Sequence, residues 1–160
     1  MRTHTRLGQL VQRLATADWF ARHAPGLMPH LDRLVHRLTG GRMMLSNGML
    51  PVILLTTTGA KSGLPRESPL AAVPLHGHHY IVGSNFGGQS HPSWSYNLVA
   101  SPRATMSLKG AVREVEAHLL TPEQREHVWP ELTRAWPPFD TYVERSGRDL
   151  RVFRLVEVRA

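Results

Sequence analysis

The segment Pro51–Leu70 constrains the fold of this chain more than any other stretch of its sequence. It begins with Val52–Thr58, an unbroken run of β-branched and aliphatic residues, which is typical of a strand buried on both faces. Gly59 and Gly63 follow, and glycine tolerates the positive φ angles of tight turns. The residues after Gly63 are again compatible with an extended chain. The sequence therefore predicts a β-hairpin whose turn is bracketed by two glycines.

The side chains at the tip of this turn suit an anionic ligand. Lys61 and Ser62 lie between the two glycines, and Arg66 follows just behind them. An ammonium, a hydroxyl, a guanidinium and backbone N–H groups bind phosphates or carboxylates through charge-assisted hydrogen bonds. The turn is not a P-loop, because the spacing G-x-x-x-x-G-K-[S/T] is absent. The alternative is a solvated hairpin turn with two ordinary surface cations.

The composition limits the other functions open to the chain. Its 160 residues, of which 41% are hydrophobic, predict a globular protein with a sizeable core. There are no cysteines, which excludes disulfides, thiolate nucleophiles and cysteine-based metal sites. No apolar run is long enough to span a bilayer, and the N-terminus lacks the apolar core of a signal peptide. We therefore expect a cytoplasmic protein.

The formal net charge of +7 is concentrated in residues 1–42. This segment holds seven arginines against two aspartates, a surplus of five, and the rest of the chain supplies the remaining two. Apolar residues recur at helical spacing over 5–22 and 27–38, which predicts two amphipathic basic helices ahead of a main domain over 43–160. We interpret them as helices packed against the outside of the sheet. Peripheral contact with an anionic membrane is the alternative.

After the hairpin, the sequence predicts a meander of strands interrupted by one short helix. The predicted strands are 68–75, 79–84, 103–109, 112–119 and 150–158. The predicted helices are 92–100 and 121–135, the second with Thr121 and Gln124 in a capping-box pattern, while 139–146 is helical or irregular. Short connections favour an antiparallel barrel, so the predicted fold class is α+β, mainly β. His76 and His78 have no further ligand at a metal-binding spacing, so we expect no metal.

Three stretches carry a resemblance to a known family: L-L-T-T-T-G-A-K-S-G-L-P-R-E-S-P-L at 54–70, Y-I-V-G-S-N-F-G-G-Q-S-H-P-S-W-S-Y-N-L at 80–98, and A-W-P-P-F-D-T-Y at 135–142. In this order and spacing they resemble the deazaflavin-dependent nitroreductase family. Its members are similar to the flavin-binding split β-barrel proteins and use reduced coenzyme F420, an 8-hydroxy-5-deazaflavin. The resemblance implies an antiparallel split β-barrel with flanking helices. It also implies an oxidoreductase that passes a hydride to a quinone, enone or nitro compound, with FMN the less favoured cofactor.

The resemblance also implies which residues form the site. The first motif would bind the phosphate and oligoglutamate tail of the cofactor with Ala60, Lys61, Ser62 and Arg66. The strand that follows would lie alongside the cofactor with Glu67, Ser68, Pro69, Leu70 and Ala71. The second would lie beside the deazaflavin ring and close over it with Val82, Gly83, Ser84, Asn85, Ser93, Trp94, Ser95, Tyr96 and Asn97. Ser84 and Tyr142 are the expected catalytic donors to the acceptor, assisted by the backbone around Gly83. Trp136 and Phe139 would form an apolar wall, with core packing as the alternative for all three aromatics.

The chain departs from the family pattern at two positions. Ala60 stands where the family commonly has a second cation, which predicts weaker binding of the anionic tail. Phe139 stands where nitroimidazole-reducing members have tyrosine, which predicts weak nitroimidazole reduction.

Two other function classes stay open. One is a non-catalytic flavin or deazaflavin carrier, which would keep the tail site without an acceptor pocket. The other is a nucleic-acid-binding module that uses the basic N-terminal segment, although no nucleic-acid-binding motif is present there. We expect a small-molecule acceptor and no nucleic-acid partner.

Overall fold

The computed structural model describes residues 17, 18, 22 and 50–159. Apart from residues 17, 18 and 22, the two predicted N-terminal helices lie outside this described part, as does the predicted division of the chain between residues 42 and 43. Within it, no helix is long and apolar enough to cross a membrane.

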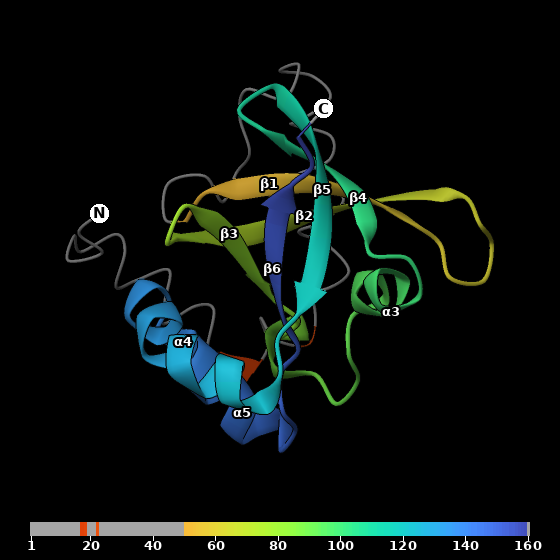
Figure 1. Cartoon of the computed structure of the whole chain (residues 1–160). Coiled ribbons are helices and arrows are strands. Elements are labelled where there is room, and N and C mark those ends of the chain that lie inside the picture. The colour runs from red at the N-terminus through yellow and green to blue at the C-terminus, as the bar shows by residue number, and fades with distance from the viewer. Residues whose placement is uncertain (1–16, 19–21, 23–49, 160) are drawn as a thin grey trace.

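Six antiparallel strands close into a barrel that is flanked by helices (Figure 1). The elements in chain order are β1 Val52–Thr58, β2 Pro65–Leu75, β3 His78–Val82, the 3-10 turn η1 Asn85–Gly87, α3 Ser93–Ala100, β4 Arg103–Leu108, β5 Ala111–Leu119, α4 Pro122–Ala135, α5 Pro138–Ser146 and β6 Val152–Glu157. Around the barrel the strands are ordered β1-β2-β3-β6-β5-β4. This confirms the predicted antiparallel barrel with flanking helices.

The barrel interior is filled by side chains that alternate along each strand. Ile53 and Leu55 of β1 point inward and are fully buried, and every other strand contributes to the same cluster. Trp94 and Leu98 bring one face of α3 into this interior. The outward-facing residues of β1 at its start are also buried. β1 is therefore buried on both faces over most of its length, as its apolar run predicts.

A second core lies on the outside of the barrel, under α4 and α5 (Figure 1). Its buried members come from β2, β3, β6 and the two helices, and include Val73, Tyr80, Val152, Val128, Leu132, Phe139 and Tyr142. The helices begin and end where the sequence predicts. Thr121 Oγ1 accepts a hydrogen bond from the Gln124 N–H at 3.3 Å, and the Gln124 side chain accepts one from the Thr121 N–H at 3.0 Å, which completes the capping box.

Two strand boundaries differ from the prediction near the motifs. β3 ends at Val82 and not at Ser84, because the Ser84 N–H turns back to the Val82 carbonyl at 2.9 Å and leaves the ladder. β2 begins at Pro65 and not at Ser68, so Arg66 is already paired in the sheet, opposite Thr57. Most of the first motif therefore belongs to two paired strands that extend past the barrel (Figure 1).

Candidate functional site

The turn between β1 and β2 needs both of its bracketing glycines. A Cβ on Gly59 would lie 2.5 Å from Ser62 Oγ and 3.2 Å from the Leu64 carbonyl oxygen, and Gly63 has a φ of +67°. The Gly59 N–H donates to Leu64 O at 2.9 Å, and the Gly63 N–H donates to Gly59 O at 2.8 Å. This closed turn leaves Lys61 and Ser62 exposed at its tip.

Helix α3 is fastened to this turn through the buried carboxamide of Asn97. Asn97 Oδ1 accepts from the Ala60 N–H at 2.9 Å, and Asn97 Nδ2 donates to Thr57 Oγ1 at 3.0 Å. The structure therefore brings the first motif and the end of the second motif together, as the resemblance implies. The carboxamide of Asn97 itself is occupied by these two structural bonds.

Lys61 and Arg66 are exposed, and neither belongs to an ion pair within the described part of the chain. Arg66 Nη2 lies 3.4 Å from Ser62 Oγ, so the guanidinium and the hydroxyl are neighbours on one side of the turn. The two cations keep their charge for a ligand, because no carboxylate among the described residues neutralises either of them. This arrangement suits a phosphate or carboxylate group.

Alternation along β2 divides its predicted cofactor-binding residues between two faces. Leu70 packs against the barrel interior, so Ser68 shares its inward direction. Glu67, Pro69 and Ala71 point outward, paired with Thr56, Leu54 and Val52 of β1. A ligand on the outer face of β2 can contact these three outward residues, while the side chains of Ser68 and Leu70 serve the barrel.

The outer face of β2 changes character along its length. At one end lies Ala71. Because the antiparallel register pairs Ala72 with Ile81, Val82 of β3 lies beside Ala71 on the same face. At the other end, six residues away, Pro65 leads into the cationic turn. Six residues of strand span about 20 Å at about 3.3 Å each. The face is therefore apolar at Ala71 and leads at Pro65 into the turn that bears Lys61. Glu67 also lies on this face, whereas Arg66 alternates to the opposite one.

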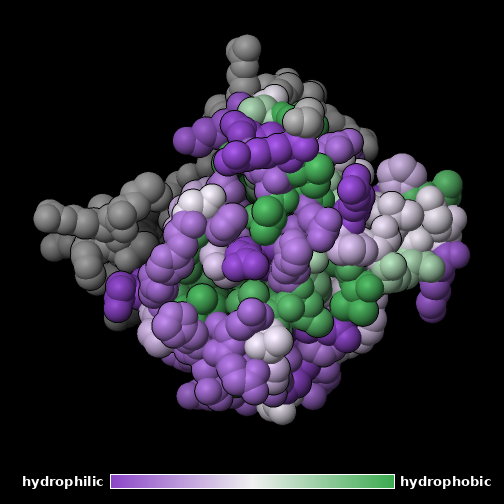
Figure 2. Space-filling view, in the orientation of Figure 1, coloured by the Kyte–Doolittle hydropathy of each residue, from purple (hydrophilic) through white to green (hydrophobic). Residues whose placement is uncertain are grey.

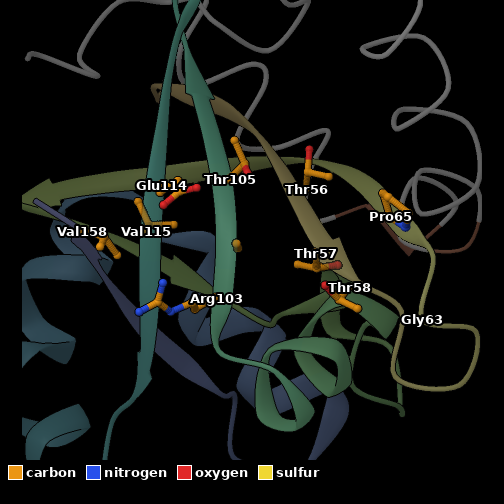
Figure 3. A pocket seen from close by; sticks show the side chains of 11 residues that line it. Thr56, Thr57, Thr58, Gly63, Pro65, Arg103, Thr105, Glu114, Val115 and Val158 are labelled. Atoms are coloured by element: carbon orange, nitrogen blue, oxygen red, sulfur yellow. The ribbon is translucent and has the colours of Figure 1, made fainter. Parts of the chain in front are cut away.

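A pocket of about 280 Å³ adjoins the base of the turn (Figure 3). Its lining is rich in hydroxyls and includes Gly63, Pro65, Thr56, Thr58, Thr105, Arg103 and Glu114. Thr56 and Thr105 are cross-strand partners on β1 and β4. One guanidinium and one carboxylate leave this lining formally neutral, so it offers hydrogen bonds and not a net attraction for anions.

The segment after β3 does not present its backbone donors to a ligand. The Gly83 N–H donates to the Arg151 carbonyl at 2.8 Å, and the Ser84 N–H is used by Val82. A Cβ on Gly83 would meet Arg151 and Pro92, so protein lies against this glycine. These two N–H groups are therefore already bonded within the protein, and polarisation of the acceptor by the backbone around Gly83 stays a prediction. The Ser84 side chain is half-buried and remains the candidate donor of this segment.

Helix α3 exposes Ser93 and Tyr96 and buries Trp94, Ser95, Asn97 and Leu98. Trp94 is only 7% exposed and packs on Phe153 in the barrel at a ring distance of 5.8 Å. Its indole thus packs in the core, and its expected contact with the cofactor stays a prediction. Ser95 Oγ donates to the Pro92 carbonyl at 2.8 Å, which ties the first turn of the helix. Leu64 of the turn and Tyr96 and Val99 of α3 are exposed apolar side chains. Figure 2 shows a face of the molecule on which hydrophobic and hydrophilic residues are mixed.

The three aromatics of the third stretch lie in the second core. Phe139 and Tyr142 are 5% and 1% exposed and contact each other edge to face at 6.5 Å. Burial raises the pKa of Tyr142 to about 12, partly offset by a hydrogen bond with Trp136. This placement favours the alternative of core packing over an acceptor wall. Tyr142 also touches Phe86 of the loop after β3 at 6.2 Å, so it supports the site from behind.

No group of three or more potential metal ligands occurs among the described residues. His76 instead pairs with Glu131 at 2.9 Å.

Comparison with known proteins decides the family. A family model described as F420H(2)-dependent quinone reductase matches residues 30–157, which is most of the chain. The chain belongs to this family. The predicted deazaflavin family, the oxidoreductase class and the coenzyme F420 dependence are thereby confirmed.

Two relatives agree with this family, and a more distant solved structure shares only the fold. The F420H(2)-dependent quinone reductase Rv1261c of Mycobacterium tuberculosis is 30% identical over 143 residues, which are 84% of this chain and 93% of the relative. The solved structure of an F420-H2 dependent reductase, FDR-A, is 37% identical with a TM-score of 0.60 and covers 66% of this chain and 94% of its own. HutZ, a heme storage protein of Vibrio cholerae, is 13% identical with a TM-score of 0.51 over 81% of this chain and 92% of its own, and shares the fold alone.

Sequence reasoning missed two residues of this reductase that the fold brings to the site. Arg103 comes from β4 and lines the pocket beside the turn. Arg148 follows α5 and lies against the loop after β3. Both lie outside the three quoted stretches, so no local signal marks them.

Proposed function

We propose that this chain passes a hydride from reduced coenzyme F420 to a quinone-type acceptor, bound along the outer face of β2. The observation that carries the proposal is the course of that face, from the apolar residues Ala71 and Val82 to the β1–β2 turn with Lys61 at its tip. A flat ring joined to a polyanionic tail fits such a face in one direction only. The donor set at the cationic end therefore fits the cofactor that the family name specifies.

The turn would hold the anionic tail. Lys61 and Arg66 supply two charges, and the N–H groups of Lys61 and Ser62 lie beside them at the tip. Charge-assisted hydrogen bonds contribute about 1.5–3 kcal/mol each when made to a charged group. Ala60 adds no charge, and its N–H is bonded to Asn97, so the tail is held by fewer groups than the family pattern supplies.

The apolar end would hold the ring and the acceptor. When bound, the deazaflavin supplies the hydride. Ala71 and Val82 offer a flat apolar surface, and the adjacent Ser84 hydroxyl could donate to an acceptor oxygen that gains negative charge. Tyr142 acts in this proposal through Phe86 and not on the acceptor, because its side chain is buried.

This arrangement favours quinones over nitroimidazoles. Reduction of a nitro group places charge on its oxygens, and the loss of one donor to such charge typically costs about 10²–10³ in rate. Phe139 and Tyr142 both lie in the core, so Ser84 is the one side-chain donor that this proposal places at the acceptor. We therefore propose quinone reduction as the main activity, with enones as further acceptors.

The test is a fluorescence titration of the chain with the deazaflavin, FMN and FAD, followed by turnover with a soluble quinone. The proposal requires tightest binding of the deazaflavin and quinone-dependent oxidation of its reduced form. Tight binding without turnover would favour a non-catalytic carrier instead. Tighter binding of FMN than of the deazaflavin would contradict the tail site.

A further inference from the structure

The loop Gly83–His91, which carries Ser84, is held in a strained conformation. Asn85, Phe86 and Gly87 have φ angles of 47°, 52° and 79°, so three consecutive residues are left-handed. For the two that are not glycine this conformation is unfavourable, and such strain persists only where the surrounding contacts over-determine it. Strained backbone of this kind gathers at active sites.

One side chain from outside the loop supplies most of those contacts. The guanidinium of Arg148 has five N–H donors. Four of them reach carbonyl oxygens of the loop: Gly88 at 3.0 Å, Gly83 at 3.2 Å, Ser84 at 3.0 Å and Ser90 at 3.0 Å. The remaining donor, on Nη1, reaches His91 Nδ1 at 2.9 Å. Every donor of Arg148 is therefore spent on this one loop, including both of its ends.

Neighbouring contacts fix the middle of the loop against α5. Arg145 Nη1 donates to the Phe86 carbonyl at 3.3 Å, and a Cβ on Gly87 would lie 2.9 Å from Arg145 Cδ. Inside the loop, the Gly87 and Gly88 N–H groups donate to Ser84 O and Asn85 O, each at 2.9 Å. These two amides report directly on whether the loop keeps its shape.

His91 can accept from Arg148 only while its Nδ1 is unprotonated, because a guanidinium has no acceptor. Its ring lies edge-on to Tyr96 at 6.0 Å, and Arg151 lies over the Tyr96 ring at 4.6 Å. Burial, together with Arg151 and Arg148, holds the pKa of His91 below its usual value. None of the ion pairs in the described part of the chain includes His91. Protonation would thus place a third cation beside two arginines and remove one of the five acceptors.

We infer that Arg148 is a positioning residue of the reductase: it holds the strained Gly83–His91 loop so that Ser84 faces the acceptor, and it does so only while His91 is neutral. The inference rests on the proposed function, because it assigns the loop to the acceptor end of that site. It adds Arg148, which lies outside the three stretches, and gives a proton-dependent role to His91 within the second. The expected consequence is a loss of rate with little loss of tail binding.

The first test compares Arg148→Lys with wild type. Lysine has three donors and no fork, so it cannot reach all five acceptors. Displacement of reacting groups by about 1 Å costs about 10²-fold in rate, so kcat for a soluble quinone should fall by about 10- to 10²-fold. Deazaflavin affinity should change by less than about threefold, because the cationic turn that dominates it is intact.

The matched control is Arg125→Lys. Arg125 lies on α4 and also binds the segment after α5, through Asp149 at 2.8 Å and the Leu150 carbonyl at 3.5 Å, but it does not touch the loop. Its replacement should leave kcat unchanged. Equal losses in the two variants would overturn the inference, because they would show that any weakening of this region lowers the rate.

A second readout needs neither cofactor nor activity. Hydrogen–deuterium exchange of the Gly87 and Gly88 amides in the cofactor-free protein should be about tenfold faster, or more, in Arg148→Lys than in wild type, and unchanged in Arg125→Lys. Unchanged exchange in Arg148→Lys would overturn the inference even if quinone turnover were never observed. A wild type that fails to reduce quinones, with Arg148-dependent exchange, would instead contradict only the proposed function.

The third test uses the variant His91→Asn to separate the effect of His91 protonation from other effects of pH. The carboxamide oxygen of the introduced side chain takes the place of the imidazole Nδ1 and accepts from Arg148 without titrating. Wild-type kcat should fall as the pH drops through the pKa of His91, which lies below the usual value of about 6.5. His91→Asn should lack this fall, while other effects of acid remain in both proteins. An identical acid limb in the two proteins would show that His91 does not control the loop.

Discussion

Lys61 lies at the tip of the β1–β2 turn and is one of only two lysines in the chain. We predict that Lys61→Ala weakens deazaflavin binding by about 1.5–3 kcal/mol, because a charge-assisted hydrogen bond is lost. The loss should be larger at low salt than at high salt. Lys109→Ala, at the exposed tip of the β4–β5 hairpin, is the matched control and should bind normally. Fluorescence titration at two ionic strengths measures both.

The neighbouring position tests the same site in the opposite direction. Ala60→Arg restores the cation that the family pattern carries, and we predict tighter binding in the same titration. Ala60 is exposed and contributes only its N–H to the fold, so the substitution should not disturb the turn. Unchanged affinity would show that this side chain points away from the tail.

The substitution Tyr142→Phe distinguishes a packing role of this residue from a catalytic one. The pKa of its buried phenol is raised to about 12 from 10, so the unfolded chain ionises first as the pH rises. Stability should therefore be lost between pH 10 and pH 12, by about 2–3 kcal/mol at 1.36 kcal/mol per unit. Tyr142→Phe should abolish this alkaline loss and keep quinone turnover within about threefold, whereas a catalytic donor would cost about 10²-fold or more. Denaturant unfolding at both pH values and steady-state rates distinguish the two.

At the scale of elements, β3 and the following loop carry an acid-sensitive pair of histidines. Burial lowers the pKa of His79, with Glu157 opposing and Arg113 reinforcing the shift, and burial also lowers that of His91. The unfolded chain then binds more protons than the folded one below the usual value of about 6.5, so stability should fall as the pH drops through that range. Unfolding free energies measured on either side of that value test this, and the dependence should shrink in His79→Gln. A slope that is unchanged in the variant would assign the effect to other groups.

The elements that the sequence predicts correctly are those whose conformation is determined by residues close to them in the chain. The apolar run of β1, the glycines of the turn and the capping box at Thr121 each specify a conformation within a few residues. The site residues were predicted less well, because their roles depend on register and on distant partners. Trp94 lies in the barrel interior, and Phe139 of α5 lies in the second core. No feature of either motif distinguishes a buried ring from one that faces a ligand. Arg148 lies 57 residues or more from its five acceptors, so no pattern in the chain predicts its role.

At the scale of the whole molecule, the positive charge is uneven. Residues 1–42 carry a surplus of five positive charges out of a net +7. If they contact an anionic membrane, the full chain should cosediment with anionic vesicles at low salt and not with neutral ones. Arg6→Gln together with Arg13→Gln should weaken that binding. Equal recovery with neutral and anionic vesicles would favour helices that pack on the sheet.

The central claim is hydride transfer from the reduced deazaflavin to a quinone at the outer face of β2. Its most direct test is the steady-state oxidation of reduced coenzyme F420 by a soluble quinone, in wild type, Lys61→Ala and Lys109→Ala. We predict saturable turnover by wild type and Lys109→Ala, and a value of kcat/KM for the cofactor that is about 10- to 150-fold lower in Lys61→Ala. Absence of quinone-dependent oxidation in a wild-type protein that binds the deazaflavin would contradict the account.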